Sequence, residues 1–512
     1  MVTLGRRTLL GGVAAGALPL VRPGEPPDLT SPLRSLPDPF TLGVASGDPW
    51  PTSVVLWTRL APEPLSPDGL GGMPRREVLV EWQVADDAGF LRLARSGYTL
   101  ATPAWAHSVH AEVDGLEPGR EYWYRFRVEG HVSPAGRTRT APAPGARVET
   151  ARFAVASCAN FEEGWFTAYA RLAEEEPDLV LHLGDYLYES PEIGTGPHHV
   201  RGHEGAETRT LAEYRQRHAQ YKTDAQLQHA HAAAPWAVVF DDHEVDANWA
   251  GSSPQTPQPH FSRRRAAAFR AYYEHMPLRR SSLPHGADLP VFRRLAWGDL
   301  ATVHLLDTRQ YRNDQVCGDT RVIGCTARQT VERTILGHRQ ERWLDRGLAR
   351  STARWDLLAQ QVFVAPKDSY PGPLEEFAMD AWDGYPAARR RLLRSFVNGR
   401  VRNPVVLTGD VHRHYANDLL LDDTTVAAEL VTTSVSSGGD GSERTALTDV
   451  QLAENPHIKW ADSRRGYVVL ELGSGALRAR FRTVPYVSRP GAPVSTAATF
   501  GLADLERGLV RA

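Results

Sequence analysis

The sequence has few cysteines, no excess of positive charge and no long apolar run. Only three of its 512 residues are cysteine, which excludes a small framework held together by disulfides. The formal net charge is −3, so we expect no nucleic-acid-binding patch, because binding phosphates over a long surface needs concentrated positive charge. No apolar run reaches the roughly 18–20 residues that a membrane span needs, and we expect no transmembrane span.

The remaining composition is typical of a folded globular protein. Hydrophobic residues make up 42% of the chain and charged residues 23%, both close to the average for such proteins. At about 100–200 residues per domain, the length predicts roughly two to four domains. We find no internal repeat, and we expect a monomer.

Residues 1–28 resemble an export signal. Arg6 and Arg7 precede Thr8-Leu9-Leu10 and a short, glycine-rich apolar stretch. A charged start before such a stretch is typical of a twin-arginine signal peptide, which directs export of folded proteins. We therefore expect the twin-arginine export machinery as a partner and a secreted protein, either extracellular or in the periplasm or cell wall.

Residues 29–145 predict a small all-β domain, because short β-rich runs are separated by turn residues. The turn that begins at Leu116 contains proline and glycine, and the alternating aromatic residues Tyr122, Tyr124 and Phe126 follow it. This pattern resembles the tyrosine corner of fibronectin-like sandwiches.

Residues 146–512 predict a layered α/β domain. Short continuous apolar strands alternate with helical stretches, as in a sheet that is covered on both faces. A short helix at 503–506 is expected to cover the site as a lid. We expect strands at 153–157, 179–183, 237–240, 301–306, 355–358 and 405–408, and helices at 165–176, 340–348 and 387–398.

Polar side chains follow five of these strands at the point where each strand ends. In open α/β sheets, ligands bind beyond the carboxyl ends of the strands. A single carboxylate there is usually a turn or cap residue, but repetition at distant strands indicates a shared site. Carboxylates, imidazoles and a thiolate crowded together need a compensating cation. The residues are Cys158, Asn160, Asp185, Tyr186, Tyr188, Asp241, Asp242, His243, Glu244, Asn248, Asp307, Arg309, Asp410, His412 and His414.

Four motifs carry a resemblance to a known family. They are Ser157-Cys158-x-Asn160, Gly184-Asp185-Tyr-Leu-Tyr188-Glu189, Asp241-Asp242-His243-Glu244 and Gly409-Asp410-Val-His412. In this order they resemble the alkaline phosphatase D family, a branch of the calcineurin-like metallophosphoesterases that includes a secreted phospholipase D of Streptomyces type. The resemblance covers nearly the whole chain after the signal. It implies a metallophosphoesterase β-sandwich flanked by helices, preceded by a small fibronectin-like all-β domain.

The resemblance also implies an activity. The expected function is that of a secreted, metal-dependent phosphoric ester hydrolase in which a metal-bound hydroxide attacks the phosphorus of a phosphate monoester or diester. A phosphodiesterase or phospholipase D that acts on phospholipid headgroups would share the same motifs. A secreted phosphate- or lipid-binding protein without catalysis is the alternative of another class.

The resemblance further implies an iron site. The Cys158 thiolate and the Tyr188 phenolate are both anionic and suit Fe³⁺ better than zinc or magnesium. Asp185 is expected to bridge two metals, and His412 to complete the iron site.

The second metal implied by the resemblance is Ca²⁺, which prefers carboxylate and amide oxygens. Asp410 is expected to bind it, with either Asp242 or Asn248, between which the sequence does not decide. Asp383, in the motif Trp-Asp-Gly-Tyr, is a further candidate calcium ligand.

Two residues are candidates for catalysis. His243 is expected to act as general acid at the leaving oxygen, with orientation of Asp185 as the alternative. Arg309 is a candidate phosphate clamp, although a structural arginine is an equally open alternative in a chain in which only three of 58 basic residues are lysine. In an exported protein, Cys317 and Cys325 are expected to form a disulfide, which leaves Cys158 as the free thiol.

Overall fold

The computed structural model describes residues 36–512 except 193, 195 and 197. The predicted export signal at residues 1–28 lies outside the described residues. None of the helices in the described part of the chain has the length and apolarity that crossing a membrane would require.

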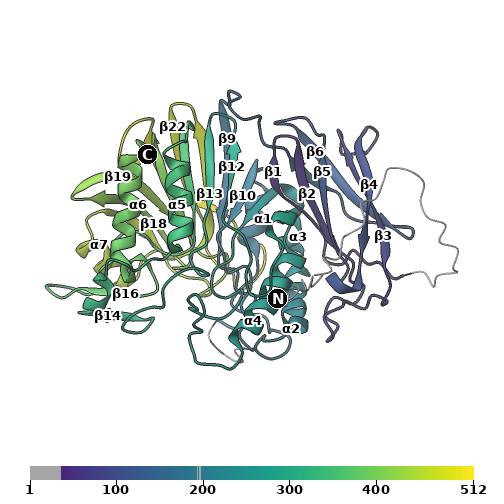
Figure 1. The fold of residues 1–512 in the computed structure, drawn as a ribbon, viewed down its shortest axis with the longest axis horizontal. Helices are drawn as coiled ribbons and strands as arrows, with labels where there is room; N and C mark the ends of the chain where they lie inside the picture. Colours follow the sequence, from purple (N-terminus) through teal and green to yellow (C-terminus); the bar gives the residue numbers. More distant parts are fainter. Residues whose placement is uncertain (1–35, 193, 195, 197) are drawn as a thin grey trace, which may run out of the picture. The chain divides into compact units, whose positions relative to one another are not determined.

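Two β-sheets of ten and seven strands pack face to face (Figure 1). Phe153 and Leu181 from the larger sheet meet Val303, Leu357 and Val405 from the smaller one in a shared core. The larger sheet has the order β24 (Val510–Arg511), β23 (Ser495–Ala503), β22 (Ala476–Val484), β21 (Arg465–Gly473), β9 (Thr150–Ala156), β10 (Leu179–His182), β11 (Pro235–Val238), β1 (Val44–Trp50), β2 (Ser53–Arg59) and β5 (Ser108–Asp114). The smaller sheet has the order β12 (Arg293–Trp297), β13 (Ala301–Leu305), β15 (Trp355–Ala359), β17 (Pro404–Thr408), β19 (Thr424–Val431), β18 (His414–Leu421) and β20 (Ile458–Asp462).

Helices cover the outer face of each sheet, which confirms the predicted layered fold. Tyr169, Leu227 and Phe269 pack helices against the larger sheet. Leu344 and Leu392 do the same on the smaller sheet, where α5 and α6 lie side by side (Figure 1). The helices are α1 (Thr167–Ala173), α2 (Leu211–Lys222), α3 (Ala225–Ala233), α4 (Phe261–His275), α5 (Gly337–Leu348), α6 (Pro386–Asn398) and α7 (Ala446–Glu454).

Side-chain caps fix where α2 and α3 begin. Thr210 and Glu213 form a reciprocal capping box at the start of α2. At α3 the Asp224 carboxylate accepts hydrogen bonds from the backbone N–H groups of Gln226 and Leu227. Each cap satisfies N–H groups that have no partner within the helix.

The N-terminal region forms the predicted small sandwich. Its outer sheet has the order β4 (Leu93–Ala101), β3 (Val78–Ala85), β6 (Glu121–Val128) and β7 (His131–Val132), with β8 (Gly136–Arg139) also paired to β6. Val80 and Phe126 of this sheet pack against Val54 and Leu56 of β2. The tyrosine corner is confirmed, because the Glu117 N–H donates a 2.9 Å hydrogen bond to the Tyr122 hydroxyl.

The inner sheet of this sandwich is part of the ten-stranded sheet. Strand β1 pairs in parallel with β11, with Ser46 opposite Pro235. Strands from both sides of the predicted boundary at residue 145 therefore share one hydrogen-bonded ladder. The N-terminal region extends the ten-stranded sheet and does not stand apart from it.

The predicted helix at 503–506 is wrong. Ala503 ends strand β23, and a turn follows. The Asp504 carboxylate accepts hydrogen bonds from Arg354, Arg402 and Asn403 at 2.5–2.9 Å. These contacts hold the segment against the loops of the smaller sheet.

The predicted disulfide is confirmed, because Cys317 and Cys325 are bonded. The loop between them contains β14 (Arg321–Ile323), which pairs with β16 (Glu376–Ala378). Among the described residues, Cys158 is the free cysteine.

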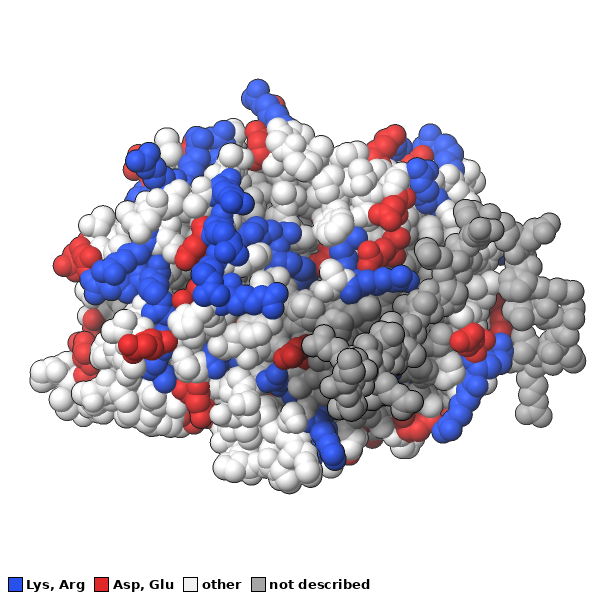
Figure 2. All heavy atoms as spheres, in the orientation of Figure 1, with Lys and Arg blue, Asp and Glu red and all other residues white. Residues whose placement is uncertain are grey.

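Arginine side chains gather on the face formed by α5 and α6 (Figure 2). Arg339, Arg342 and Arg346 on α5 are exposed, as are Arg390 and Arg394 on α6. A net charge of −3 for the whole chain does not reveal this local excess.

A lysine with no carboxylate partner among the described residues is buried behind the larger sheet. Lys222 is 1% exposed, and its ammonium lies 3.4 Å from His231 Nε2 and 4.2 Å from the Trp57 ring centroid. Burial lowers the pKa of Lys222 well below its usual value, and burial also lowers the pKa of His231 and His218. In the unfolded chain Lys222 holds its proton below about pH 10.4. Because the pKa of Lys222 is lower in the folded chain than in the unfolded one, charge on this residue opposes folding at pH values where the unfolded lysine is protonated.

We expect Lys222→Met to raise the free energy of unfolding at pH 7 by about 1–3 kcal/mol, because methionine fills the site without a proton to lose. The gain should shrink toward pH 10, where the unfolded lysine also becomes neutral. Urea unfolding at the two pH values measures this. Lys459→Met is the matched control, because Lys459 is partly exposed and pairs with Asp418 at 2.8 Å. A gain from Lys222→Met that does not change with pH would contradict a lowered pKa of Lys222 in the folded protein.

Candidate metal centre

The predicted site residues come together where the ends of the two sheets meet. In the larger sheet β9, β10 and β11 are parallel, and they lead into Cys158, Asp185 and Asp242. In the smaller sheet β17 leads into Asp410 and His412. A single bridge from Ser157 to Ser434 joins the chain segments at this edge. The carboxyl ends of strands from both sheets thus line one site, as expected for this class of fold.

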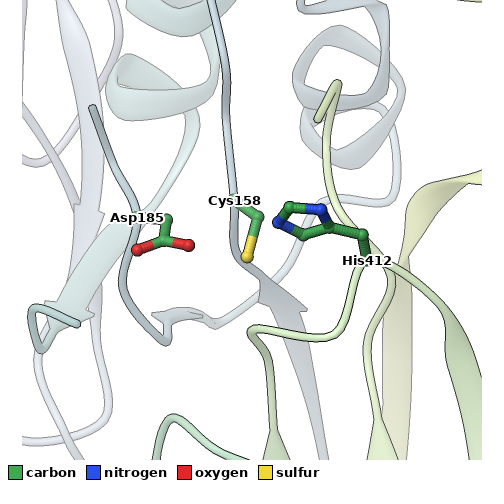
Figure 3. Close-up of side chains that lie close together, drawn as sticks. All are labelled: Cys158, Asp185 and His412. Carbon is green, nitrogen blue, oxygen red and sulfur yellow. The ribbon is translucent and has the colours of Figure 1, made fainter. Parts of the chain in front are cut away.

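The first group of possible metal ligands contains Cys158, Asp185 and His412. One ligand atom from each residue lies within 4.8 Å of the others, and the three side chains point toward one another (Figure 3). Tyr188 adjoins them, because its hydroxyl donates to Asp185 Oδ2 at 3.2 Å and lies 3.1 Å from His412 Nε2. The four residues of the predicted iron site therefore lie close together.

Two further groups continue from the first. Asp185, Asp242 and His243 form one, and Asp241, Asp242 and Asp410 form the other, with ligand atoms again within 4.8 Å. Because Asp185 and Asp242 each belong to two groups, the three groups form one continuous cluster.

Burial makes this cluster electrostatically costly. It raises the pKa of the Cys158 thiol, and the Asp185 carboxylate adds to the effect. Burial likewise raises the pKa of Asp185 and Asp410, and neighbouring carboxylates raise both further. For Asp241, burial and the Asp242 carboxylate outweigh Arg309 and raise the pKa to about 7. Cations would offset this repulsion and keep the groups ionised.

Free oxygen atoms show that the donor set fits cations. Asp185 Oδ1, Asp241 Oδ2 and Asp242 Oδ1 are buried and accept no hydrogen bond from the described residues, although the Arg309 guanidinium lies 3.4 Å from the third. Buried carboxylate oxygens normally have partners. These three oxygens, with a thiol, a phenol and an imidazole beside them, form a mixed set of donors that fits metal cations.

The backbone is strained at the same place. Cys158, Asp185, Asn248, Asp410 and His412 all have φ between 48° and 63°, a left-handed conformation that non-glycine residues adopt at a cost of about 1–3 kcal/mol each. Five such residues in one site indicate that the turns after the strands are held in place to aim these side chains inward.

A glycine permits the close approach of two of these turns. Gly184 has a φ of 110°, and a Cβ atom there would lie 2.4 Å from the Asp241 Cβ. A side chain at this position would therefore push apart the turns that carry Asp185 and Asp241.

His243 is held by a carboxylate on one side and faces the cluster on the other. Its Nδ1 lies 2.7 Å from Glu189 Oε2 and its Nε2 3.9 Å from Asp242 Oδ2. Burial lowers the pKa of His243, but the carboxylates of Glu189, Asp242 and Asp185 outweigh burial and raise it well above its usual value.

Arg309 lies beneath the cluster and is fully buried. Its two terminal nitrogens donate to the two oxygens of Asp380 at 2.7 and 2.9 Å, and its Nε donates to Asp241 Oδ1 at 2.5 Å. It also lies 3.4 Å from Asp242. The predicted clamp would be open to substrate, whereas this guanidinium is a counter-ion among carboxylates.

Asn248 lies beside Asp242. Its backbone N–H donates to Asp242 Oδ2 at 2.7 Å, and its side-chain amide donates to Asp319 Oδ2 at 3.2 Å. Both candidates for the second-metal ligand are therefore at the cluster, with the Asp242 carboxylate in two of the three groups.

Asp383 is placed differently from the other predicted ligands. Its two carboxylate oxygens accept hydrogen bonds from the Lys367 backbone N–H at 3.0 Å and from Arg389 at 2.6 Å. It belongs to none of the three ligand groups among the described residues.

Comparisons with known proteins identify the family. The sequence model of the PhoD-like phosphatase matches residues 153–481, and the model of the PhoD-like phosphatase N-terminal domain matches residues 28–142. Alkaline phosphatase D of Bacillus subtilis (strain 168) is 48% identical over 480 residues, which cover 92% of this chain and 82% of that protein. The chain belongs to the PhoD-like phosphatase family.

A solved structure of PhoD agrees with this assignment. It superposes with a TM-score of 0.90 at 47% sequence identity and covers 95% of this chain and 93% of that one. The resemblance found from the four motifs is therefore confirmed. As a PhoD-like phosphatase, the chain is a phosphoric ester hydrolase.

Sequence reasoning missed four contributors to the site. Glu189 holds His243, and Asp380 holds Arg309. The Ser437 hydroxyl donates to the Tyr188 hydroxyl at 2.7 Å. Asp241 was noted at its strand end but not as a possible ligand, although it is in the third group. For Glu189 and Asp241, the motifs already contained the signal. Ser437 and Asp380 lie in segments with no strand-end pattern.

We expect Arg309→Gln to lower the free energy of unfolding by about 3–5 kcal/mol in the presence of a chelator, because Asp241 and Asp242 lose their guanidinium partner and Asp380 keeps only Arg312 as a cationic partner among the described residues. The double variant Arg309→Gln/Asp380→Asn should recover part of this loss, since it removes one of the buried carboxylates that Arg309 pairs with. Urea unfolding of both variants measures the difference. Arg346→Gln, exposed on α5, is the matched control and should change stability by less than about 0.5 kcal/mol. Equal losses in the single and double variants would contradict the counter-ion role.

Proposed function

We propose that this PhoD-like phosphatase is an exported enzyme that hydrolyses phosphate esters with Fe³⁺ and Ca²⁺. Fe³⁺ would be held by Cys158, Tyr188, Asp185 and His412, and Ca²⁺ would be held near Asp410. The observation that carries the proposal is the continuity of the three ligand groups. A cluster that shares carboxylates can hold neighbouring cations, which a single closed metal site cannot do.

Calcium would be bound by oxygens at the other end of the cluster. Asp185, Asp242 and Asp410 supply carboxylates, and Asn248 can turn its amide oxygen toward the same place. We place Asp383 outside this ligand set, because hydrogen bonds use both of its oxygens.

When bound, the cations would withdraw charge from the phosphate oxygens and lower the pKa of a water molecule for attack on phosphorus. The residues of the chain supply the rest. Asp185 and Asp242 fix the spacing between the two ends of the cluster. Arg309 keeps Asp241 and Asp380 in place from beneath, and we propose it as a positioning residue and not as a clamp on substrate.

His243 is proposed as the acid that protonates the leaving oxygen. The Glu189 carboxylate accepts from Nδ1–H at 2.7 Å, which leaves Nε2 on the side of the cluster. A histidine held in this way presents one nitrogen in a fixed direction. The competing role for His243 is orientation of Asp185. The two roles are distinguished by how strongly turnover depends on the basicity of the leaving group.

Export through the twin-arginine machinery is part of the proposal. It rests on the Arg6-Arg7 pair and on the disulfide between Cys317 and Cys325, because structural disulfides persist in oxidising compartments.

We expect Cys158→Ser to lose iron and Asp185→Asn to lose both metals, each with at least a hundredfold fall in turnover of p-nitrophenyl phosphate and with the fold retained. Metal analysis after purification without chelators and circular dichroism measure these effects. Asp345→Asn, an exposed carboxylate on α5, is the control and should keep metal and activity.

Protein with iron and calcium and a visible charge-transfer absorption would support the assignment of Cys158 and Tyr188. Zinc alone in active, colourless protein would contradict it. The ratio of turnover on p-nitrophenyl phosphate to that on bis-p-nitrophenyl phosphate ranks the monoesterase against the diesterase. Stoichiometric metal with no turnover of any ester would favour a binding protein.

A further inference from the structure

A pocket of about 480 Å³ adjoins the candidate metal centre. Asp410 and His412 form part of its wall, so the pocket and the metal cluster share two residues. Gly441, Ser442 and Thr445 also line it. A substrate with its phosphate at the cluster therefore has room to extend in this direction.

Four basic side chains line this pocket: Arg321, Lys367, Arg413 and Arg465. Asp410 is the one acidic residue among its described lining residues. The pocket therefore has an excess of positive charge directly beside a cluster of carboxylates. A concave surface of one sign concentrates ligands of the opposite sign.

Lys367 is the most informative of the four. The residue is 7% exposed, and its ammonium lies over the rings of Phe363 and Tyr415, 4.0 and 5.1 Å from their centroids. Burial lowers the pKa of Lys367 to about 8, although the Asp410 and Asp383 carboxylates act in the opposite direction. These two carboxylates do not offset the cost of burying the ammonium, and an anion in the pocket would stabilise it further.

Arg465 fixes the pocket relative to the metal cluster. Its guanidinium donates to the Ser434 hydroxyl and to the backbone carbonyls of Ser437 and Ser463. The hydroxyl of the same Ser437 donates to Tyr188 in the first ligand group. The two sites are thus joined through one serine.

We propose that this pocket is a basic subsite for a second anionic group of the substrate, a phosphate or carboxylate on the part of the molecule that does not react. The preferred substrates are then phosphate esters that carry a further negative charge. This inference rests on the proposed function, because it places the reacting phosphate at the metal cluster.

The test uses pairs of substrates that differ only in this charge. The 2-, 3- and 4-carboxyphenyl phosphates are each compared with the corresponding carbamoylphenyl phosphate, in which a neutral amide replaces the carboxylate. The three isomers vary the distance between the two groups. We expect kcat/KM to be about tenfold higher for at least one carboxylate than for its amide, as for a charge-assisted hydrogen bond.

Two variants connect the preference to the pocket. Lys367→Met keeps the apolar contact with Phe363 and Tyr415 without the charge, and Arg413→Gln changes a residue that is only half-buried. Each variant should bring the ratio of kcat/KM for the carboxylate to kcat/KM for the amide toward one, mainly through a higher KM for the carboxylate. Arg394→Gln, exposed on α6, should leave it unchanged. Equal rates within every pair, or a preference that survives in both variants, would overturn the subsite.

Binding of the matching non-hydrolysable phosphonates, measured by calorimetry, separates this inference from the proposed function. Tighter binding of a carboxyphenyl phosphonate that is lost in Lys367→Met supports the subsite even if no ester is turned over. Turnover of all esters without a preference for the carboxylate supports the function and overturns the subsite. If inorganic phosphate alone binds in a Lys367-dependent way and the phosphonate pairs bind equally, the pocket holds free phosphate and the proposal fails.

Discussion

Repulsion among buried carboxylates is the constraint on which the rest of the site depends. Asp185, Asp241 and Asp242 come from the larger sheet and Asp410 from the smaller one, and their ligand atoms lie within overlapping groups. The protein supplies one buried guanidinium, that of Arg309, against them. Even with the His243 imidazole, whose pKa Asp185 and Asp242 help to raise, the positive charge of the side chains does not match four carboxylates. The turns and sheet edges therefore have the geometry of a site for cations.

The fold was largely predictable because short stretches of sequence indicate most of its strands and turns. Strands such as β15 and β17 are continuous apolar runs buried along their whole length, and the tyrosine corner follows a turn with proline and glycine. The pairing of strands that are far apart in the sequence cannot be predicted from the residues around each strand. Nothing near Ser46 indicates that it lies opposite Pro235, and nothing in the short polar segment after Ala503 shows that Asp504 would bind arginines and not start a helix.

The site was predictable where a side chain follows a strand directly. Cys158, Asp185, Asp242 and Asp410 all do so, and strand order then brings them together. The direction in which a side chain points from an irregular loop was not predictable. Asp380 and Asp383 are three residues apart, yet Asp380 binds Arg309 beneath the cluster while Asp383 binds Arg389. Burial of Arg309 also depends on tertiary packing that its sequence neighbours do not specify.

The order of strands in the larger sheet has a consequence for how the protein is made. Strand β9, which leads to Cys158, has β10 on one side and β21 on the other, with Val155 opposite Val468. During synthesis from the N-terminus, β9 therefore remains unpaired on one side until β21, more than 300 residues later, has been made. Contacts of such long range slow folding. Ser437, which donates a hydrogen bond to the Tyr188 hydroxyl, is also synthesised late. The candidate ligands can reach their final positions only after β21 has been synthesised, so a metal ion would be bound late in the synthesis of the polypeptide.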